Sequence, residues 1–261
     1  MTKSRPRNRP KSSSGKARTS SPGHGTWLWG QHAVLGALTN PRREVLRLLV
    51  TRNMMSRLPA DQQQRATETG PAELDRHLPQ GAVHQGVAAE VCPLPDVALE
   101  DLIAAEVNRI VVLDQLTDPH NLGAIFRSAS AFGFSAIVLQ TRNTPPITGV
   151  VAKSAAGAIE TVAECRVVNI SRALDQLNAA GFHSVGLDGQ GRSDITAALR
   201  GATRLAVVLG AEGGGLRPGV ARACAELARI PIASAMESLN VSNAAAIAFY
   251  EAQRVAAGSA I

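Results

Sequence analysis

The sequence predicts an α/β protein whose larger part is built on a mostly parallel sheet. Short, continuous apolar runs, of which RIVVLD at 109–114 is one, recur from residue 109 onward, and such runs are typical of strands buried on both faces. Segments with helical periodicity, such as residues 121–133, separate these runs. Strands that alternate with helices place the helices on both faces of one sheet, and the loops after the strands then lie at its carboxyl edge.

The elements of this part follow in order from their local patterns. We expect strands at 109–114, 135–140, 183–189, 204–210 and 227–232. We expect helices at 121–133, 151–159, 171–181 and 243–257, with a short helix after the 204–210 strand. No internal repeat divides these elements, so they are assigned to one domain, residues 105–261.

A small α/β unit precedes this domain and is here called the front unit, residues 26–92. Its pattern predicts a strand and a helix over 26–41, a strand over 44–51, a helix over 60–70 and a strand over 86–91. The prolines of CPLPDVALED are typical of a connection between units. Residues 93–104 are therefore the expected linker.

The first 25 residues form a basic tail of different composition. They contain seven Lys or Arg and no acid, so the formal net charge of +6 leaves about −1 for the rest of the chain. Ser, Pro and Gly dominate the tail, which predicts disorder. An arm that follows a nucleic-acid backbone and a solubilising tail both fit this composition. Lys153 is the only lysine beyond the tail.

Composition excludes several classes of protein. Apolar residues make up 45% of the chain, enough for a core, but no apolar run reaches the ~20 residues of a membrane span. Cys92, Cys165 and Cys224 lack the spacing of a disulfide framework or a zinc site, and His120 and His183 lack metal-like partners. We therefore expect a cytoplasmic protein with no membrane segment and no metal.

An arginine stands on an unusual helix face in DPHNLGAIFRSASAFG, residues 118–133. At 100° per residue, one apolar stripe collects Leu122, Ile125, Phe126, Ala129 and Phe132. Arg127 points away from that stripe and is flanked by Gly123, Ala124 and Ala131. Solvated helix faces usually carry paired Glu and Lys. The small neighbours of Arg127 therefore indicate that a backbone, a nucleotide or a second subunit approaches it.

Three loops at the expected carboxyl edge carry the candidate chemistry. The first, LDQLTDPHNLG, holds Asp118 and Asn121, and either residue can cap the helix that follows. The second, LGAEGGGLRPG, places four glycines around Glu212, so its backbone can approach a ligand closely, although it lacks the phosphate-loop and dinucleotide patterns. The third lies in IPIASAMESLNVSNAAAI. It carries more polar residues than one cap requires, namely Ser238, Asn240, Ser242 and Asn243.

Together these loops resemble the three motifs of the SpoU, or TrmH-like, branch of the SPOUT RNA methyltransferases. NLGAIFRSA (121–129) is similar to the first motif with its glycine at Gly123, and VVLGAEGGGL (207–216) is similar to the second. IPIASAMESLNVSNAAAIAFYE (230–251) is similar to the third. The front unit, with GAVHQGVAAEV (81–91), resembles the substrate-binding domain of the bacterial 23S ribosomal RNA guanosine 2′-O-methyltransferases.

The resemblance implies methyl transfer from S-adenosyl-L-methionine to a ribose 2′-hydroxyl, with 23S ribosomal RNA as the expected substrate and no metal required. It also implies a SPOUT-type domain with a C-terminal trefoil knot, and a homodimer. By motif position, the resemblance implies that the catalytic arginine is Arg127 and that Asn121 and Glu212 support it. Ser238 and Asn240 are implied to orient the substrate or the base. The implied cofactor contacts are Gly210, Ile230 and Leu239.

The chemistry of Arg127 constrains its role. A free guanidinium has a pKa above ~12, far from that of a useful general base at neutral pH. We therefore expect Arg127 to bind a neighbouring phosphate and to stabilise negative charge on the attacking oxygen. Two alternative functions stay open: a methyltransferase for transfer RNA or for resistance-type ribosomal RNA sites, and a non-catalytic RNA-binding ribosome-assembly factor. A dehydrogenase is disfavoured because the dinucleotide glycine pattern is absent.

Overall fold

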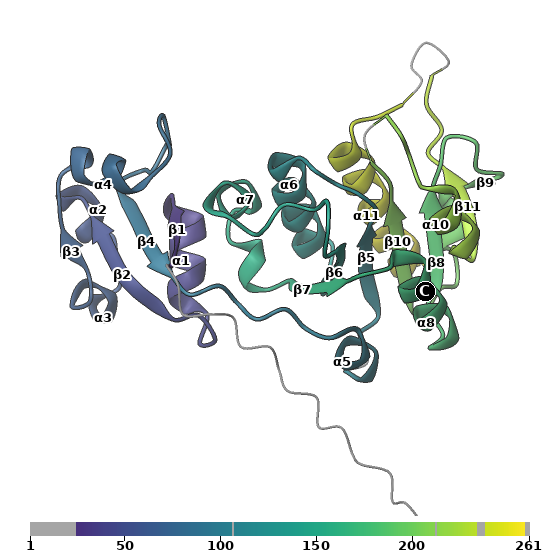
Figure 1. Cartoon of the computed structure of the whole chain (residues 1–261), viewed down its shortest axis with the longest axis horizontal. Coiled ribbons are helices and arrows are strands. Elements are labelled where there is room, and N and C mark those ends of the chain that lie inside the picture. The colour runs from purple at the N-terminus through teal and green to yellow at the C-terminus, as the bar shows by residue number, and fades with distance from the viewer. Residues whose placement is uncertain (1–24, 106, 212, 234–237, 259–261) are drawn as a thin grey trace, which may run out of the picture.

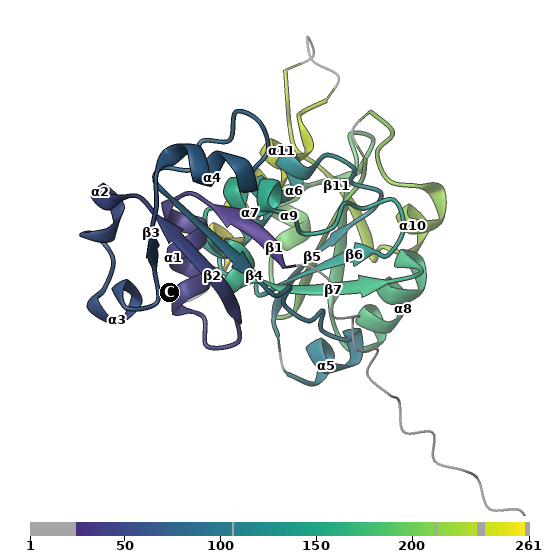
Figure 2. The ribbon, with the colours of Figure 1, turned by 60° about the vertical axis from the view of Figure 1, so that its left-hand side comes forward.

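The computed structural model describes residues 25–105, 107–211, 213–233 and 238–258. Figures 1 and 2 show two sheets side by side, each with its own helices. The smaller sheet has the strand order β1-β4-β2-β3, and the larger has the order β7-β6-β5-β10-β8-β11-β9. In the part of the chain that is described, no helix is both long and apolar enough to cross a bilayer.

The smaller sheet belongs to the front unit. Its strands are β1 (Thr26–Trp29), β2 (Val45–Val50), β3 (Thr67–Glu68) and β4 (Val87–Val91). Its helices are α1 (Gln31–Thr39), α2 (Arg52–Met55), α3 (Ala60–Gln63) and α4 (Pro71–His77). The predicted helix over 60–70 is wrong beyond its first turn. Thr67 and Glu68 instead pair in parallel with Leu49 and Val50, which the local polar pattern does not indicate.

The larger sheet confirms the predicted parallel architecture, because every pair of neighbouring strands in it is parallel. Its strands are β5 (Arg109–Leu113), β6 (Ala136–Gln140), β7 (Ala163–Val167), β8 (His183–Leu187), β9 (Ser193–Asp194), β10 (Leu205–Leu209) and β11 (Glu226–Arg229). The sequence missed β7 and β9, the two edge strands. In β7 the charged pair Glu164 and Arg166 interrupts the apolar run, as edge strands commonly do.

Helices cover both faces of the larger sheet. One face packs against α6 (Pro119–Ala131), α7 (Gly149–Ala155), α9 (Ile195–Leu199), α11 (Val241–Gly258) and the short 3-10 turn η1 (Ala158–Glu160). The other face packs against α5 (Leu99–Ala104), α8 (Ile170–Ala179) and α10 (Pro218–Ala223). This double covering explains why the central strands read as continuous apolar runs.

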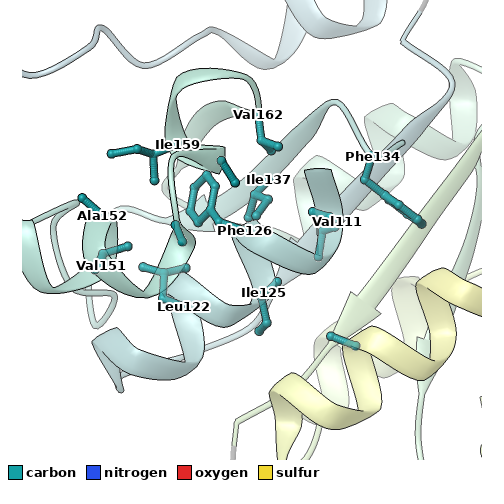
Figure 3. Packing of buried hydrophobic residues seen from close by; sticks show 14 of the residues in the cluster. Val111, Leu122, Ile125, Phe126, Phe134, Ile137, Val151, Ala152, Ile159 and Val162 are labelled. Carbon is teal, nitrogen blue, oxygen red and sulfur yellow. The ribbon is translucent and has the colours of Figure 1, made fainter. Parts of the chain in front are cut away.

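The stripe predicted for α6 is confirmed. Leu122, Ile125, Phe126 and Ala129 are buried, and Phe132 is partly buried. Figure 3 shows the ring of Phe126 among Ile137, Ile159 and Val162, so α6 packs against both the sheet and the η1 turn. Packing in the main core of the protein therefore fixes the position of α6.

The stretch expected to be a linker contains a helix. Leu99 and Leu102 of α5 are buried in the second core cluster, and the N–H of Val97 donates to the carbonyl of Glu164 at 2.7 Å. Residues 97–104 thus pack on the larger sheet, and residues 93–96 alone have the character of a connection. Two leucines three residues apart are too short a pattern to distinguish such a helix from a loop.

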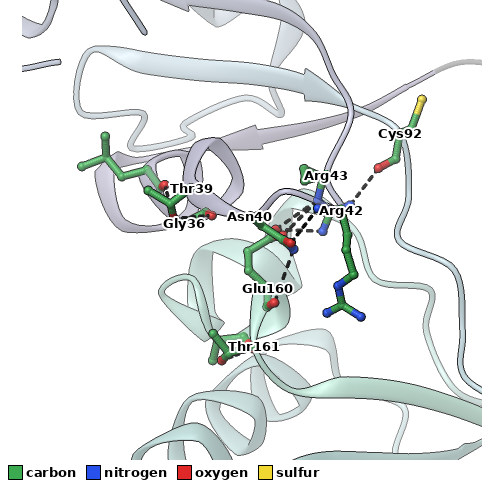
Figure 4. A network of polar contacts seen from close by, with 10 residues as sticks. Gly36, Thr39, Asn40, Arg42, Arg43, Cys92, Glu160 and Thr161 are labelled. Atoms are coloured by element: carbon green, nitrogen blue, oxygen red, sulfur yellow. Dashed lines mark hydrogen bonds and ion pairs between the residues drawn. The ribbon is translucent and has the colours of Figure 1, made fainter. Parts of the chain in front are cut away.

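The front unit meets the larger sheet at a junction formed mainly by α7 and η1. Arg43 and Glu160 form an ion pair there at 2.8 Å, with only 4% and 3% of their side chains exposed. Asn40 Nδ2 donates to the same carboxylate at 2.8 Å, and Arg43 also donates to the carbonyl of Cys92 at 2.8 Å (Figure 4). A carboxylate buried with this many donors fixes the two sheets relative to one another.

Candidate active site

The loops after β5 and β10 meet at the carboxyl edge of the larger sheet, as predicted. The two strands are neighbours in register, with Leu113 opposite Leu209, so the following residues start side by side. The N–H of Asp114 donates to the carbonyl of Leu209 at 2.8 Å, which continues the pairing into the loops.

An ion pair that sequence reasoning missed, between the buried Asp114 and the partly exposed Arg217, connects these two loops. Asp114 has no exposed surface, and its carboxylate accepts from Arg217 Nε at 2.8 Å and from the Arg217 N–H at 3.0 Å. Arg217 also donates to Gln140 Oε1 at 3.1 Å, at the end of β6. One side chain thus links the ends of three strands. The sequence did contain a signal for this pair, namely an Asp directly after a buried strand and an Arg inside the glycine-rich loop.

Asp118, rather than Asn121, caps α6. Its carboxylate accepts from the N–H groups of His120 at 3.0 Å and Asn121 at 3.2 Å. The side chain of Asn121, which is only 9% exposed, accepts from Asn240 Nδ2 at 3.2 Å. These two residues are 119 positions apart. The fold therefore joins the first and third candidate loops through one amide pair.

Asn240 also caps the last helix. Its Oδ1 accepts from the N–H groups of Ser242 at 2.9 Å and Asn243 at 3.3 Å, and from the Ser242 hydroxyl at 2.6 Å. A single residue thus begins α11 and holds Asn121, so its orientation is fixed from both sides. Ser238 is exposed just ahead of it.

Arg127 is exposed on α6, and its side chain makes no hydrogen bond or ion pair with any described residue. One part of the expectation about its neighbours is wrong. Gly123 is buried, and a Cβ there would lie 2.4 Å from Ser154 Cβ and 2.6 Å from the Val151 carbonyl oxygen. Gly123 therefore allows α7 to pack closely on α6, and it does not form part of an open surface. Ala124 and Ala131 are the small residues that remain accessible.

The glycine-rich loop folds back on itself. Ala211 and Gly215 exchange two backbone hydrogen bonds, at 3.1 and 3.0 Å. A Cβ on Gly210 would lie 2.1 Å from the Gly215 carbonyl carbon, so the turn closes only with glycine at this position. Glu212 lies outside the described residues. The close contact of Gly210 is with the loop itself, and the expected approach of this backbone to a ligand stays a prediction.

The third loop brings apolar side chains to the same edge. Ile230 and Leu239 are half-buried, and Ile232 is 39% exposed. A cavity of about 390 Å³ also opens at this edge, and it is lined by Gln115, Leu116, Thr117, Asp118, Asn143 and Ala211. A cavity between loops at the carboxyl edge of a parallel sheet is where a small molecule commonly binds.

Over the described residues, no group of three His, Cys, Asp or Glu side chains could hold a metal ion. His120 Nδ1 lies 3.3 Å from Ser154 Oγ, and His183 Nε2 lies 3.3 Å from Glu226.

Comparison with known proteins identifies the family. The model for the SpoU rRNA Methylase family matches residues 108–250, which include the α6 motif and both later loops. The chain belongs to this family. A SpoU-type relative, the 23S rRNA (guanosine-2′-O-)-methyltransferase RlmB of Vibrio vulnificus, is 42% identical over 179 residues, covering 67% of this chain and 72% of the relative. RlmB of Xylella fastidiosa is 35% identical and covers 87% of this chain and 96% of its own.

A solved structure shares the fold of this SpoU family chain. The AdoMet bound rRNA methyltransferase from Sinorhizobium meliloti has a TM-score of 0.75 at 25% identity, with 88% of this chain and 87% of that chain covered. The 88% of this chain that is matched exceeds residues 105–261, so the match also includes most of the front unit.

Proposed function

We propose that this protein transfers a methyl group from S-adenosyl-L-methionine to the ribose 2′-hydroxyl of a guanosine in 23S ribosomal RNA. The observation that carries the proposal is the SpoU family match across the three loops, of which the first and third are joined by Asn121 and Asn240. The relatives from Vibrio vulnificus and Xylella fastidiosa are both named as RlmB enzymes with this activity. The front unit would hold the RNA, and the larger unit, residues 105–261, would carry the reaction.

The residues at the carboxyl edge fit the cofactor. Adenosine and methionine need an apolar slot with backbone hydrogen-bonding groups. The turn closed by Gly210 would supply main-chain groups, and the half-buried side chains of Ile230 and Leu239 would supply apolar surface. When bound, the sulfonium of S-adenosyl-L-methionine supplies an activated methyl group, so no metal is needed. The methyltransferase from Sinorhizobium meliloti, which shares this fold, is AdoMet bound, and this supports the assignment.

Arg127 is proposed to bind the phosphate next to the target ribose and to stabilise negative charge on the 2′-oxygen. Its guanidinium is exposed and is not used by any described residue, so both of its donor edges can reach a ligand. Asn121 and Asn240 hold each other in place and would position the substrate beside it. Ser238, which is exposed, would contact the RNA, and Glu212 keeps the supporting role that its motif position implies.

A homodimer and a C-terminal trefoil knot are proposed on the same basis. On α11, Ile247 and Tyr250 are 41% and 56% exposed, and Tyr250 makes an edge contact with Phe132 of α6. Apolar side chains exposed side by side are typical of a surface covered by a second subunit. A second copy seated there would bring surface toward Arg127. The knot would involve the segment between β11 and α11, and the site of action would be the cytoplasm.

The proposal is tested by methyl transfer. Labelled S-adenosyl-L-methionine is supplied with 23S ribosomal RNA from a strain that lacks this protein, and the product is mapped by alkali-resistant linkage. We expect one modified guanosine ribose, and loss of the mark with Arg127→Ala. Arg127→Lys keeps the charge but removes the bidentate fork, so it should also lose most activity. Transfer to transfer RNA alone would overturn the assignment of the substrate.

Cofactor binding is measured separately. S-adenosylhomocysteine should raise the melting temperature of wild type and of Arg127→Ala alike, because Arg127 is assigned to RNA. Binding of the cofactor with no transfer to any RNA would favour a non-catalytic RNA-binding factor.

A further inference from the structure

Lys153 lies at the junction between the front unit and the larger sheet. It is the only lysine beyond the basic tail, and it sits in the last turn of α7. Its Nζ donates to Gln85 Oε1 of the front unit at 2.9 Å. The ammonium also lies directly over the backbone of Gly30, where a Cβ would be 2.2 Å from Nζ. Residues of both units thus set the position of this one charge.

The local backbone is arranged around this contact. Gly30 has φ +84°, and Gln85 has φ +56°, a conformation that residues other than glycine rarely adopt. Gln85 Oε1 accepts a second hydrogen bond from the N–H of Gln31 at 3.1 Å, which fixes the acceptor that Lys153 uses. A residue keeps a strained backbone conformation of this kind only where the surrounding structure holds it there. Such residues are frequent at ligand sites.

The charge on Lys153 is uncompensated among the described residues. The side chain forms no ion pair there, and one neutral amide oxygen accepts from an ammonium that has three donors. Burial lowers the pKa of Lys153 from its usual value, and no carboxylate offsets that effect. A half-buried cation without a counter-ion is costly, so an anion bound beside it would be stabilising.

A line of polar groups leads from Lys153 to Arg127. The next residue on α7 is Ser154, whose hydroxyl lies 3.3 Å from His120 Nδ1. His120 and Arg127 are seven residues apart on α6, so they share a face and lie about 10 Å apart along the axis. Only Ala124 stands between them on that face. When Ser154 donates to Nδ1, the hydrogen of a neutral ring is on Nε2, where it can reach a ligand.

We propose that Lys153 and His120 bind backbone phosphates of the RNA strand that flanks the target nucleotide, so that the strand runs from Arg127 across α6 and α7 to the front unit. The inference rests on the proposed function and adds the path of the RNA. Asp118 is the carboxylate next to His120 in the chain, and its charge is directed at the N-terminus of α6, where it accepts from the backbone N–H groups of His120 and Asn121.

The experiment measures the affinity of the full-length chain for 23S ribosomal RNA over a series of salt concentrations. Lys153→Gln removes one phosphate contact, so the slope of log K against log salt should fall by about 0.7 for a single-stranded contact. His120→Ala removes the imidazole from this face of α6, so it should weaken RNA binding. Arg172→Gln is the matched control, because Arg172 is exposed on α8, across the sheet, and should leave both unchanged.

Two further variants separate phosphate binding from a structural role. Lys153→Arg keeps the charge and should retain the wild-type slope. Gln85→Ala removes the contact between the units but keeps the lysine, and it should also retain the slope. If Lys153→Gln still methylates RNA and its salt slope equals that of wild type, the proposed path of the RNA is overturned and the proposed function is not. Absence of both RNA binding and methyl transfer in wild type would overturn the proposed function with it.

Discussion

Glu160 offers the sharpest test of how the two sheets are held together. Its carboxylate accepts from Asn40 Nδ2 and from Arg43 Nε and a terminal Arg43 nitrogen, at 2.8–3.2 Å. In Glu160→Ala, Arg43 stays 4% exposed and keeps only the carbonyl of Cys92 as an acceptor. Removing one partner of a buried ion pair typically costs about 3–5 kcal/mol, because the remaining charge is uncompensated. We expect a loss of this size in the free energy of unfolding.

The assay uses the two tryptophans of the chain, Trp27 and Trp29, both of which lie in β1 of the front unit. Urea unfolding followed by their fluorescence reports the front unit, while far-ultraviolet circular dichroism reports the whole chain. Trp29 also lies against Gly149 of α7, so its emission is sensitive to separation at the junction. In Glu160→Ala the fluorescence midpoint should fall below the dichroism midpoint, because the front unit loses its contact first.

Glu90→Ala is the matched control. Glu90, 16% exposed, pairs with Arg47, whose side chain is 50% exposed and so stays hydrated when its partner is removed. Exposed pairs contribute about 0–1 kcal/mol, so this variant should stay near wild type. The double variant Arg43→Met with Glu160→Met should recover much of the loss, because no charge remains buried. A cost for Glu160→Ala as small as that of Glu90→Ala would contradict the conclusion that this pair fixes the junction.

Two further changes have defined outcomes. Gly123→Ala places a Cβ 2.6 Å from the Val151 carbonyl oxygen, so overpacking of about 1–3 kcal/mol should exceed the helix-propensity gain and lower the melting temperature; Gly189→Ala, where the Cβ meets nothing within 4 Å, should not. Hydrogen bonding to Arg254 lowers the pKa of Glu251 from 4.5 to about 2, so its stabilisation is present above pH 4.5 and is lost as the pH falls toward 2. The melting temperature of Glu251→Gln should therefore lie below wild type by at most about 4 °C at pH 7, and the two should converge near pH 2. A difference that persists at pH 2 would exclude ionisation of Glu251 as its cause.

The parallel sheet and the buried stripe of α6 could both be predicted from the amino-acid sequence. They depend on residues close together in the chain, such as Leu122 and Phe126, whose spacing sets one face of a helix. The exposure of Arg127 follows from the same periodicity. The three motifs are short stretches of consecutive residues, and they were enough to indicate the family that the comparison then established.

Which of these residues meet depends on the tertiary structure. Asn121 contacts Asn240 across 119 positions, and Asp114 contacts Arg217 across 103, because the order of strands places their loops at one edge. The same is true of Gly123, whose small size serves the packing of α7, and of Thr67, whose strand exists only because Leu49 lies beside it. Local periodicity constrains the conformation of a segment. Contacts between distant segments depend on the order in which the chain adds strands to the sheet, and no short stretch of sequence specifies that order.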